Sequence, residues 1–257
     1  MLRLFFAAAL ALAFAFNAPA ADAPKESRLF ELRVYTATKG NLAKVEARFK
    51  DHTIKLFEKH GITNIGYWVP IKNDEEKLYY IVAHKDLKSR GESFKNFGAD
   101  PDWQKAQKES EKDGKIVAKM ESTFLTVTDY SPEVKASVGK EDRVFELRTY
   151  TATKGNLDGL NARFRDHTLK LFEKYGMTNL YYFTVPKGNK GDDVMLIYLL
   201  AHKSEEAAKK SFDEFRKDEK WIKARADSEA KAGGSLTEAK DGVKSLFLKA
   251  TDYSMTK

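Results

Sequence analysis

Two short stretches of the chain each carry a carboxylate, a guanidinium and a phenol at alternate positions. They are Glu31, Arg33 and Tyr35, and, 115 residues later, Glu146, Arg148 and Tyr150. An arginine in such a set can bind a ligand carboxylate or phosphate through two parallel hydrogen bonds. The same residues can also satisfy one another, as a Glu–Arg ion pair covered by the tyrosine. The two sets are therefore the candidate ligand-binding residues, and the structural alternative stays open.

The neighbouring residues predict that each set lies on one face of a β-strand. Phe30, Leu32 and Val34 alternate with the first polar set, which is the period-2 pattern of a strand with one apolar face. If the apolar face packs against helices, the polar face points toward a second sheet. We therefore expect the two sets to converge between two sheets, around a pseudo-twofold axis.

Histidines supply a second group of candidates, and the catalytic residues remain unknown. His52 and His167 occupy matching positions in a helical pattern of apolar residues. A helix-borne histidine that faces a sheet can ligate haem iron, although a histidine in an apolar stripe is more often a core residue. His84 and His202 end matching strands, where each could act as a general base. Capping of the following helix is the interpretation that we favour for these two.

Other chemical motifs are absent from the sequence. The chain has no cysteine, which excludes thiol nucleophiles, thiolate metal sites and disulfides. No histidine pair has the i, i+4 spacing of a helical zinc site, and neither a Gly-rich phosphate loop nor a nucleophile elbow occurs. We predict no metal site and no resident cofactor, with haem at the helix histidines as the cofactor kept as an alternative.

Aromatic residues recur later in each stretch. Phe94, Phe97 and Trp103 are matched at an offset of 118 by Phe212, Phe215 and Trp221. They could line a pocket for a flat apolar ligand. Aromatic residues at helical spacing are more often core, and that is the interpretation we favour.

The elements that position these residues follow from an internal repeat. Residues 30–64 and 145–179 are identical at 26 of 35 positions, the signature of a duplicated folding unit. Alternation and spacing predict a strand at 30–36, a helix at 42–56, strands at 62–70 and 78–84, a helical region broken in two, and a closing strand at 124–130. The second unit repeats this order and closes with a strand at 247–253. The β-α-β-β-α-β order is the ferredoxin-like pattern.

The predicted fold class is α+β. Helices cover one face of each sheet, so the two bare faces can pack together as an intramolecular dimeric α/β barrel. An edge-to-edge arrangement or a further homo-oligomer remains open. The predicted organisation is a signal peptide at 1–20, a first repeat at 28–131, a linker at 132–142 and a second repeat at 143–254.

The N-terminal segment predicts export. Arg3 precedes an apolar run at 4–16, and Ala18-Pro19-Ala20 matches a signal-peptidase site. The run is shorter than the roughly 20 residues of a membrane span. We expect cleavage after Ala20 and a periplasmic or secreted protein without stable membrane insertion; an uncleaved anchor is the alternative. Lysine and glutamate are interspersed without a basic block, so nucleic-acid binding is not expected.

Several motifs together resemble the NIPSNAP family. They are the strand 31–36, the helix end Phe57-Glu58-Lys59-His60-Gly61 followed by Gly66-Tyr67-Trp68, and Asp100-Pro101-Asp102-Trp103. The second repeat matches at 146–150 and 172–176. It departs at Tyr182-Phe183 and at 217–221, where the tryptophan of the first motif and the proline of the second are missing. The resemblance implies a dimeric α/β-barrel fold, related to small monooxygenases and haem-handling proteins.

Three functions fit these observations. The first is an exported module that binds a small apolar or aromatic ligand in or beside the barrel. The second is a barrel-type monooxygenase or haem-handling enzyme that uses the helix histidines with the strand arginines. The third is a non-catalytic interaction protein of the cell envelope. Retention of the polar residues in both strands favours the first two.

Overall fold

The first repeat has its elements in the predicted order. The structure, a computed structural model, describes residues 27–139 and 141–257, so the predicted signal peptide at 1–20 lies outside the described residues. The strands are β1 (Leu29–Ala37), β2 (Thr63–Pro70), β3 (Lys77–His84) and β4 (Val117–Val127). The helices are α1 (Leu42–Arg48), α2 (Ile54–Lys59), α3 (Leu87–Ala99) and α4 (Pro101–Ser110), with the π-helical segment η1 (Phe49–Thr53) joining α1 to α2.

The second repeat has the same elements. Its strands are β5 (Val144–Thr151), β6 (Thr178–Thr184), β7 (Met195–His202) and β8 (Val243–Ala250). Its helices are α5 (Leu157–Arg163), the π-helical η2 (Phe164–Thr168), α6 (Leu169–Lys174), α7 (Glu205–Lys217) and α8 (Glu219–Ala232). The bounds predicted for β4 and β8 were wrong. Both strands start and end earlier than predicted. The sequence pattern missed their first residues because these are mostly exposed and carry no apolar alternation.

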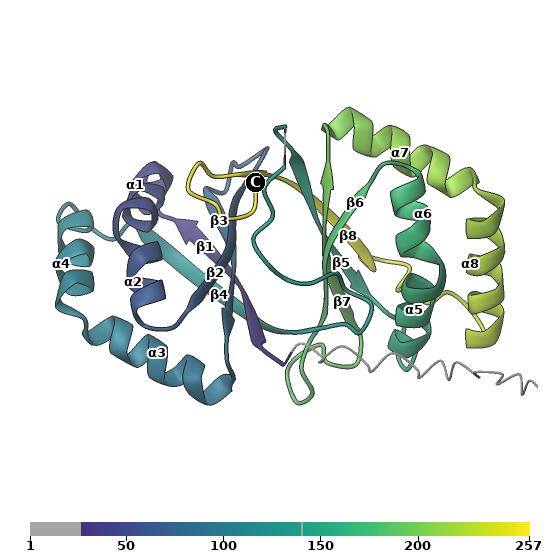
Figure 1. The fold of residues 1–257 in the computed structure, drawn as a ribbon, viewed down its shortest axis with the longest axis horizontal. Coiled ribbons are helices and arrows are strands. Elements are labelled where there is room, and N and C mark those ends of the chain that lie inside the picture. The colour runs from purple at the N-terminus through teal and green to yellow at the C-terminus, as the bar shows by residue number, and fades with distance from the viewer. Residues whose placement is uncertain (1–26, 140) are drawn as a thin grey trace, which may run out of the picture.

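The strands of the described residues form one closed barrel in the order β1-β3-β2-β8-β5-β7-β6-β4. Figure 1 shows the helices of the first repeat on one outer side and those of the second repeat on the opposite side, with the strands between them. The predicted intramolecular dimeric α/β barrel is confirmed. No helix in the described ranges is long and apolar enough to cross a membrane.

The barrel interior is filled by apolar side chains from both repeats. Phe30 and Leu32 of β1 pack there with Trp68, Phe145 and Phe183. This overturns the expectation that the apolar face of β1 meets the helices. Closure removes the inner face entirely from water, so charged groups there would be costly. The helix-covered outer face stays open along its edges and can hold the polar residues.

The seams between the repeats are short and are reinforced by the C-terminal segment. β2 and β8 pair at three positions, and β4 and β6 pair at two. Beyond β8, the Thr251 amide donates to the Tyr67 carbonyl at 3.0 Å, and the Thr256 hydroxyl donates to the Ile65 carbonyl at 2.8 Å. The last residues of the second repeat therefore hold the first repeat in place.

Candidate functional site

In the first repeat the polar set of β1 is buried beneath α3. Arg33 donates through Nη1 to Glu31 Oε1 at 2.5 Å and through Nε to the Tyr80 hydroxyl at 2.8 Å. The ring of Phe94 on α3 lies 4.8 Å from the guanidinium carbon of Arg33. Glu31 is fully buried and Arg33 is 8% exposed, so the ion pair is held away from water.

A second guanidinium, that of Arg90 on α3, completes this cluster. Its Nε and Nη2 donate to the two Glu31 oxygens at 3.0 and 2.9 Å. Its Cζ lies 4.7 Å from the centroid of the Phe94 ring and 5.4 Å from that of Phe124. Burial raises the pKa of Glu31, but His84 and the two arginines lower it by more, so the pKa lies well below its usual range.

The second repeat rebuilds the strand part of the cluster. Arg148 donates to Glu146 and, through Nε, to the Tyr198 hydroxyl at 2.9 Å. His202 Nε2 lies 2.9 Å from Glu146 Oε2, and the Ser245 hydroxyl donates to Oε1 at 2.5 Å. Burial raises the pKa of Glu146, but His202, the charge of Arg148 and Ser245 together hold that pKa below its usual range. Glu146 is therefore an ionised carboxylate at neutral pH.

The helix part of the cluster differs in the second repeat. The position of Arg90 is taken by Ala208 on α7, whose methyl group cannot reach Glu146. A cavity of about 450 Å³ lies over Glu146 and opens to the surface. It is lined by Glu146, Arg148, Glu205, Glu206, Lys209, Phe212, Arg216 and Phe247. Its volume is in the range of small-molecule pockets, which is about 300–1,000 Å³.

The two strand sets do not converge between the sheets. Each lies under the helices of its own repeat, on opposite outer sides of the barrel. The Tyr35 ring lies 5.8 Å from the Arg33 guanidinium, and the Tyr150 hydroxyl accepts from Arg148 Nη2 at 3.2 Å. The first repeat thus matches the structural alternative, an ion pair covered by a tyrosine. In the second repeat the same ion pair also lines a cavity.

His52 and His167 do not face the sheet, contrary to expectation. Both are exposed, and the buried positions belong to Thr53 and Thr168. The Thr53 hydroxyl donates to the Arg48 carbonyl five residues earlier, at 3.1 Å. The physical reason is the π-helical turn, which adds a residue to the turn and shifts the three- and four-residue spacing by one position. The helix histidines are therefore separated from the strand arginines by the helix layer itself.

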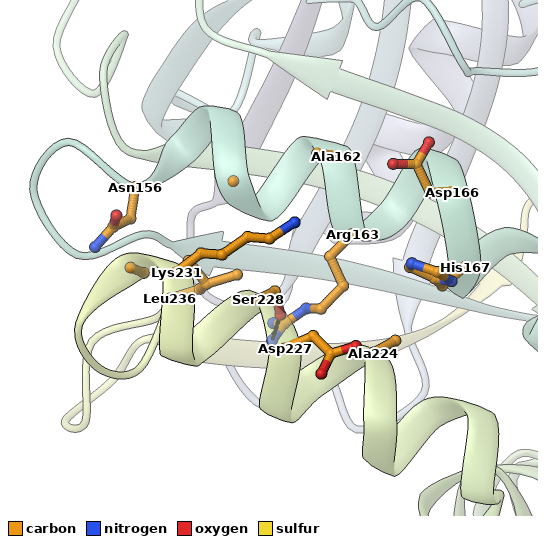
Figure 2. Close-up of a pocket in the computed structure, with 12 residues that line it drawn as sticks. Asn156, Ala162, Arg163, Asp166, His167, Ala224, Asp227, Ser228, Lys231 and Leu236 are labelled. Carbon is orange, nitrogen blue, oxygen red and sulfur yellow. Dashed lines mark hydrogen bonds between the residues drawn. The ribbon is translucent and has the colours of Figure 1, made fainter.

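Each exposed histidine instead lines a surface groove between helices. The groove of His167 measures about 270 Å³ and lies between the α5–η2 helix and α8. Figure 2 shows Arg163 extending across it toward α8, where its Nη1 lies 3.5 Å from the Ser228 hydroxyl. The groove of His52, of about 770 Å³, runs beside α4 and is lined mainly by charged side chains of both signs. In the part of the chain that the structure describes, no three histidine or acidic side chains gather as in a metal site.

His84 and His202 do not cap the following helices. Asp86 caps α3 by accepting from the Ser89 amide at 2.7 Å, and Ser204 caps α7 in the same way. The histidines instead face the strand carboxylates, His84 Nε2 at 3.3 Å from Glu31 Oε2. Each of these histidines therefore lies beside an ionised glutamate.

The recurring aromatic residues pack mostly in the layer between helices and sheet, as favoured. Trp103 lies 4.4 Å from Phe97, and Trp221 lies 4.4 Å from Phe215, between ring centroids. Phe212 is the exception, because it also lines the cavity.

Sequence reasoning missed Arg90, Ala208 and Phe247 as site residues. The offset of 118 that pairs Phe94 with Phe212 also pairs Arg90 with Ala208. That loss of a cation from one repeat was the signal available in the sequence.

Comparison with solved structures shows the barrel fold. A candidate monooxygenase from Lactobacillus acidophilus is 11% identical over 88% of this chain and 94% of its own, with a TM-score of 0.55. An anthrone oxidase-like protein is 11% identical over 88% and 92%, with a TM-score of 0.53. An uncharacterized NIPSNAP domain protein from Burkholderia xenovorans is 21% identical over 41% of this chain and 99% of its own, with a TM-score of 0.36. At these identities the first two similarities speak for the fold alone, and no argument rests on the third.

Sequence comparison identifies the family. No curated protein sequence matches the chain. The model of the NIPSNAP family matches residues 30–132 and, a second time, residues 145–254. These two segments cover most of the chain and coincide with the two halves of the barrel, so the protein belongs to the NIPSNAP family.

Proposed function

We propose that the protein is a non-catalytic module that binds a small molecule in the cavity of its second repeat. The observation that carries this proposal is an open cavity of about 450 Å³ whose lining includes the buried ion pair of Glu146 and Arg148. Phe212 and Phe247 offer ring faces to a flat apolar or aromatic body. Glu146 and Arg148 offer fixed polar groups that would orient it. The ligand site therefore lies beside the barrel, whose interior is packed with apolar side chains.

The enzymatic alternative has less support. It requires the helix histidines to act together with the strand arginines, as in a barrel-type oxygenase or a haem-handling protein. His167 is exposed in one groove, whereas Arg148 lies beneath α7 in a different cavity. A pure interaction protein of the envelope would leave the cavity and its buried charges without a role.

Ligand binding can be tested with three aromatic probes of equal size but different charge: benzyl alcohol, benzoate and benzamidine. Saturation-transfer NMR on residues 21–257 should detect at least one of them with a Kd below about 10 mM, as expected for a fragment of this size. Ala208→Arg should abolish that binding, because an arginine at this position would reach the carboxylate of Glu146 as Arg90 reaches that of Glu31 in the first repeat. Lys210→Arg, on the exposed side of the same helix, is the matched control and should bind like the wild type. Absence of binding by all three probes, or equal binding by Ala208→Arg, would contradict the proposal.

We also propose that the protein acts in the periplasm or outside the cell. The N-terminal pattern ending in Ala18-Pro19-Ala20 supports this. The intact mass of the protein recovered from expressing cells tests it. A chain that begins at Ala21 agrees with export, and a chain that retains residues 1–20 in the membrane fraction would contradict cleavage.

A further inference from the structure

In the first repeat, the side chain of Arg90 occupies the position that a ligand would take in the cavity of the second repeat. We propose that the cavity of the second repeat selects a cationic group, a guanidinium, amidinium or primary ammonium carried on an apolar body, which takes the place that Arg90 occupies in the first repeat. This inference rests on the proposed function and adds the chemical class of the ligand.

The residues around Arg90 have equivalents in the same register. Glu31 lies opposite Phe124 across β1 and β4, and Glu146 lies opposite Phe247 across β5 and β8. The helices α3 and α7 are both 13 residues long. Each places a phenylalanine, Phe94 or Phe212, at its eighth residue. The carboxylate and the two rings that hold the Arg90 guanidinium thus recur in the second repeat, where all three line the cavity.

Glu146 retains the capacity to accept a further donor. An ionised carboxylate has about four acceptor positions. Glu146 accepts from Arg148, Ser245 and His202 and makes no hydrogen bond to α7. Glu31 accepts four hydrogen bonds, one each from Arg33 and Ser122 and two from Arg90. A cation in the cavity would therefore meet an ionised, buried carboxylate that is already in position, which favours binding at low reorganisation cost.

The other charges of the cavity also favour a cation over an anion. Arg148 is the buried cation there, and three of its five N–H donors bond to Glu146 and to the hydroxyls of Tyr198 and Tyr150. An anionic ligand that reached its remaining N–H groups would be repelled by the ionised carboxylate of Glu146 beside them. At the cavity mouth, Glu205 and Glu206 stand where the first repeat has Leu87 and Lys88.

One lysine, Lys209, and one arginine, Arg216, line the same mouth, and their positive charges oppose the binding of a cation. Arg216 is paired with Asp213 at 2.5 Å, which neutralises it. Lys209 is exposed and pairs with no carboxylate among residues 27–139 and 141–257. Lys209→Ala should therefore tighten the binding of a cation.

The test compares affinities of the same three probes by calorimetry on residues 21–257. Benzamidine should bind at least about tenfold more tightly than benzyl alcohol or benzoate, since a hydrogen bond to a charged group is worth at least that ratio. Glu146→Gln keeps the shape of the side chain but removes its charge, and should abolish this preference. Arg90→Ala should open the equivalent site in the first repeat and raise the number of benzamidine molecules bound from one to two. The second repeat, with Ala208 at the same position, shows that the cluster is compatible with folding without this arginine.

The outcomes separate this inference from the proposed function. If benzyl alcohol or benzoate binds as tightly as benzamidine and Ala208→Arg blocks it, the cavity binds ligands but the choice of a cation is wrong. If Arg90→Ala melts like the wild type and still binds one benzamidine, the equivalence of the two sites is wrong. If no probe binds, both the inference and the proposed function fail.

Discussion

The strand ion pairs of the two repeats have different neighbours, so removing the arginine of each should lower the stability of the protein by unequal amounts. Arg148→Met leaves the buried carboxylate of Glu146 with only His202 and Ser245 as partners. Arg33→Met leaves Glu31 with the bond from Ser122 and the two hydrogen bonds from Arg90, at 3.0 and 2.9 Å. The same substitution should therefore destabilise the protein more in the second repeat than in the first.

The expected magnitudes follow from the partners that remain. Removing one member of a buried ion pair costs about 3–5 kcal/mol in the free energy of unfolding, and we expect Arg148→Met to fall in that range. A hydrogen bond to a charged group contributes about 1.5–3 kcal/mol. The bonds from Arg90 should therefore reduce the cost of Arg33→Met to about 1–2 kcal/mol.

Urea unfolding at pH 7, followed by circular dichroism and by tyrosine and tryptophan fluorescence, measures both losses. The control is Arg33→Met/Arg90→Ala, which strips Glu31 of both guanidiniums and should cost more than the sum of the single substitutions. Equal losses for Arg33→Met and Arg148→Met, or additive losses in the double variant, would refute the reasoning.

Three further predictions concern pH, the barrel core and the dependence of the repeats on each other. Folding lowers the pKa values of Glu31 and Glu146, so these carboxylates stabilise the fold above their ordinary pKa of 4.5, and that stabilisation should be lost as the pH falls below it. The free energy of unfolding, measured from pH 7 into the acid range, tests this, and a value that does not fall with pH would contradict it. A methyl group at Gly66 would lie 2.3 Å from Trp68 Cη2, so Gly66→Ala should cost about 1–3 kcal/mol. Adding Trp68→Phe, which copies the smaller ring of the second repeat, should restore part of it in thermal melts. Residues 27–135 alone would expose the barrel core and should not form a stable monomer; light scattering that shows a monomer with a cooperative melt would disprove this.

Local sequence patterns were enough to predict the elements. Asp100 caps α4, as expected, by accepting from the Asp102 amide at 2.9 Å, and Gly61 follows the helix with a positive φ of 74°. These features depend on contacts within a few residues, so they can be recognised in the sequence. The closed barrel also followed, because two sheets with helices on one side each have a bare face to bury.

The candidate site was predicted only in part. Alternation correctly placed Glu31, Arg33 and Tyr35 on one face of a strand. It could not show which side that face meets, because a strand pattern is the same whether the apolar side faces helices or a second sheet. The helix histidines were misplaced for a related reason. A π-helical turn shifts the spacing by one residue, and nothing in the apolar pattern around His52 and His167 marked that shift.

The sequence by itself determined the duplication, the order of the elements and the retention of one Glu–Arg–Tyr set in each repeat. Only the tertiary structure decided that the two ion pairs differ in their surroundings. That difference depends on α3 and α7, which lie far along the chain from the strands that they cover. Packing brings Arg90 onto Glu31, whereas the equivalent helix position in the second repeat carries Ala208, and a cavity lies over the buried charge of Glu146. A cavity of this kind arises from the way distant segments of the chain pack together, and no pattern of neighbouring residues encodes it.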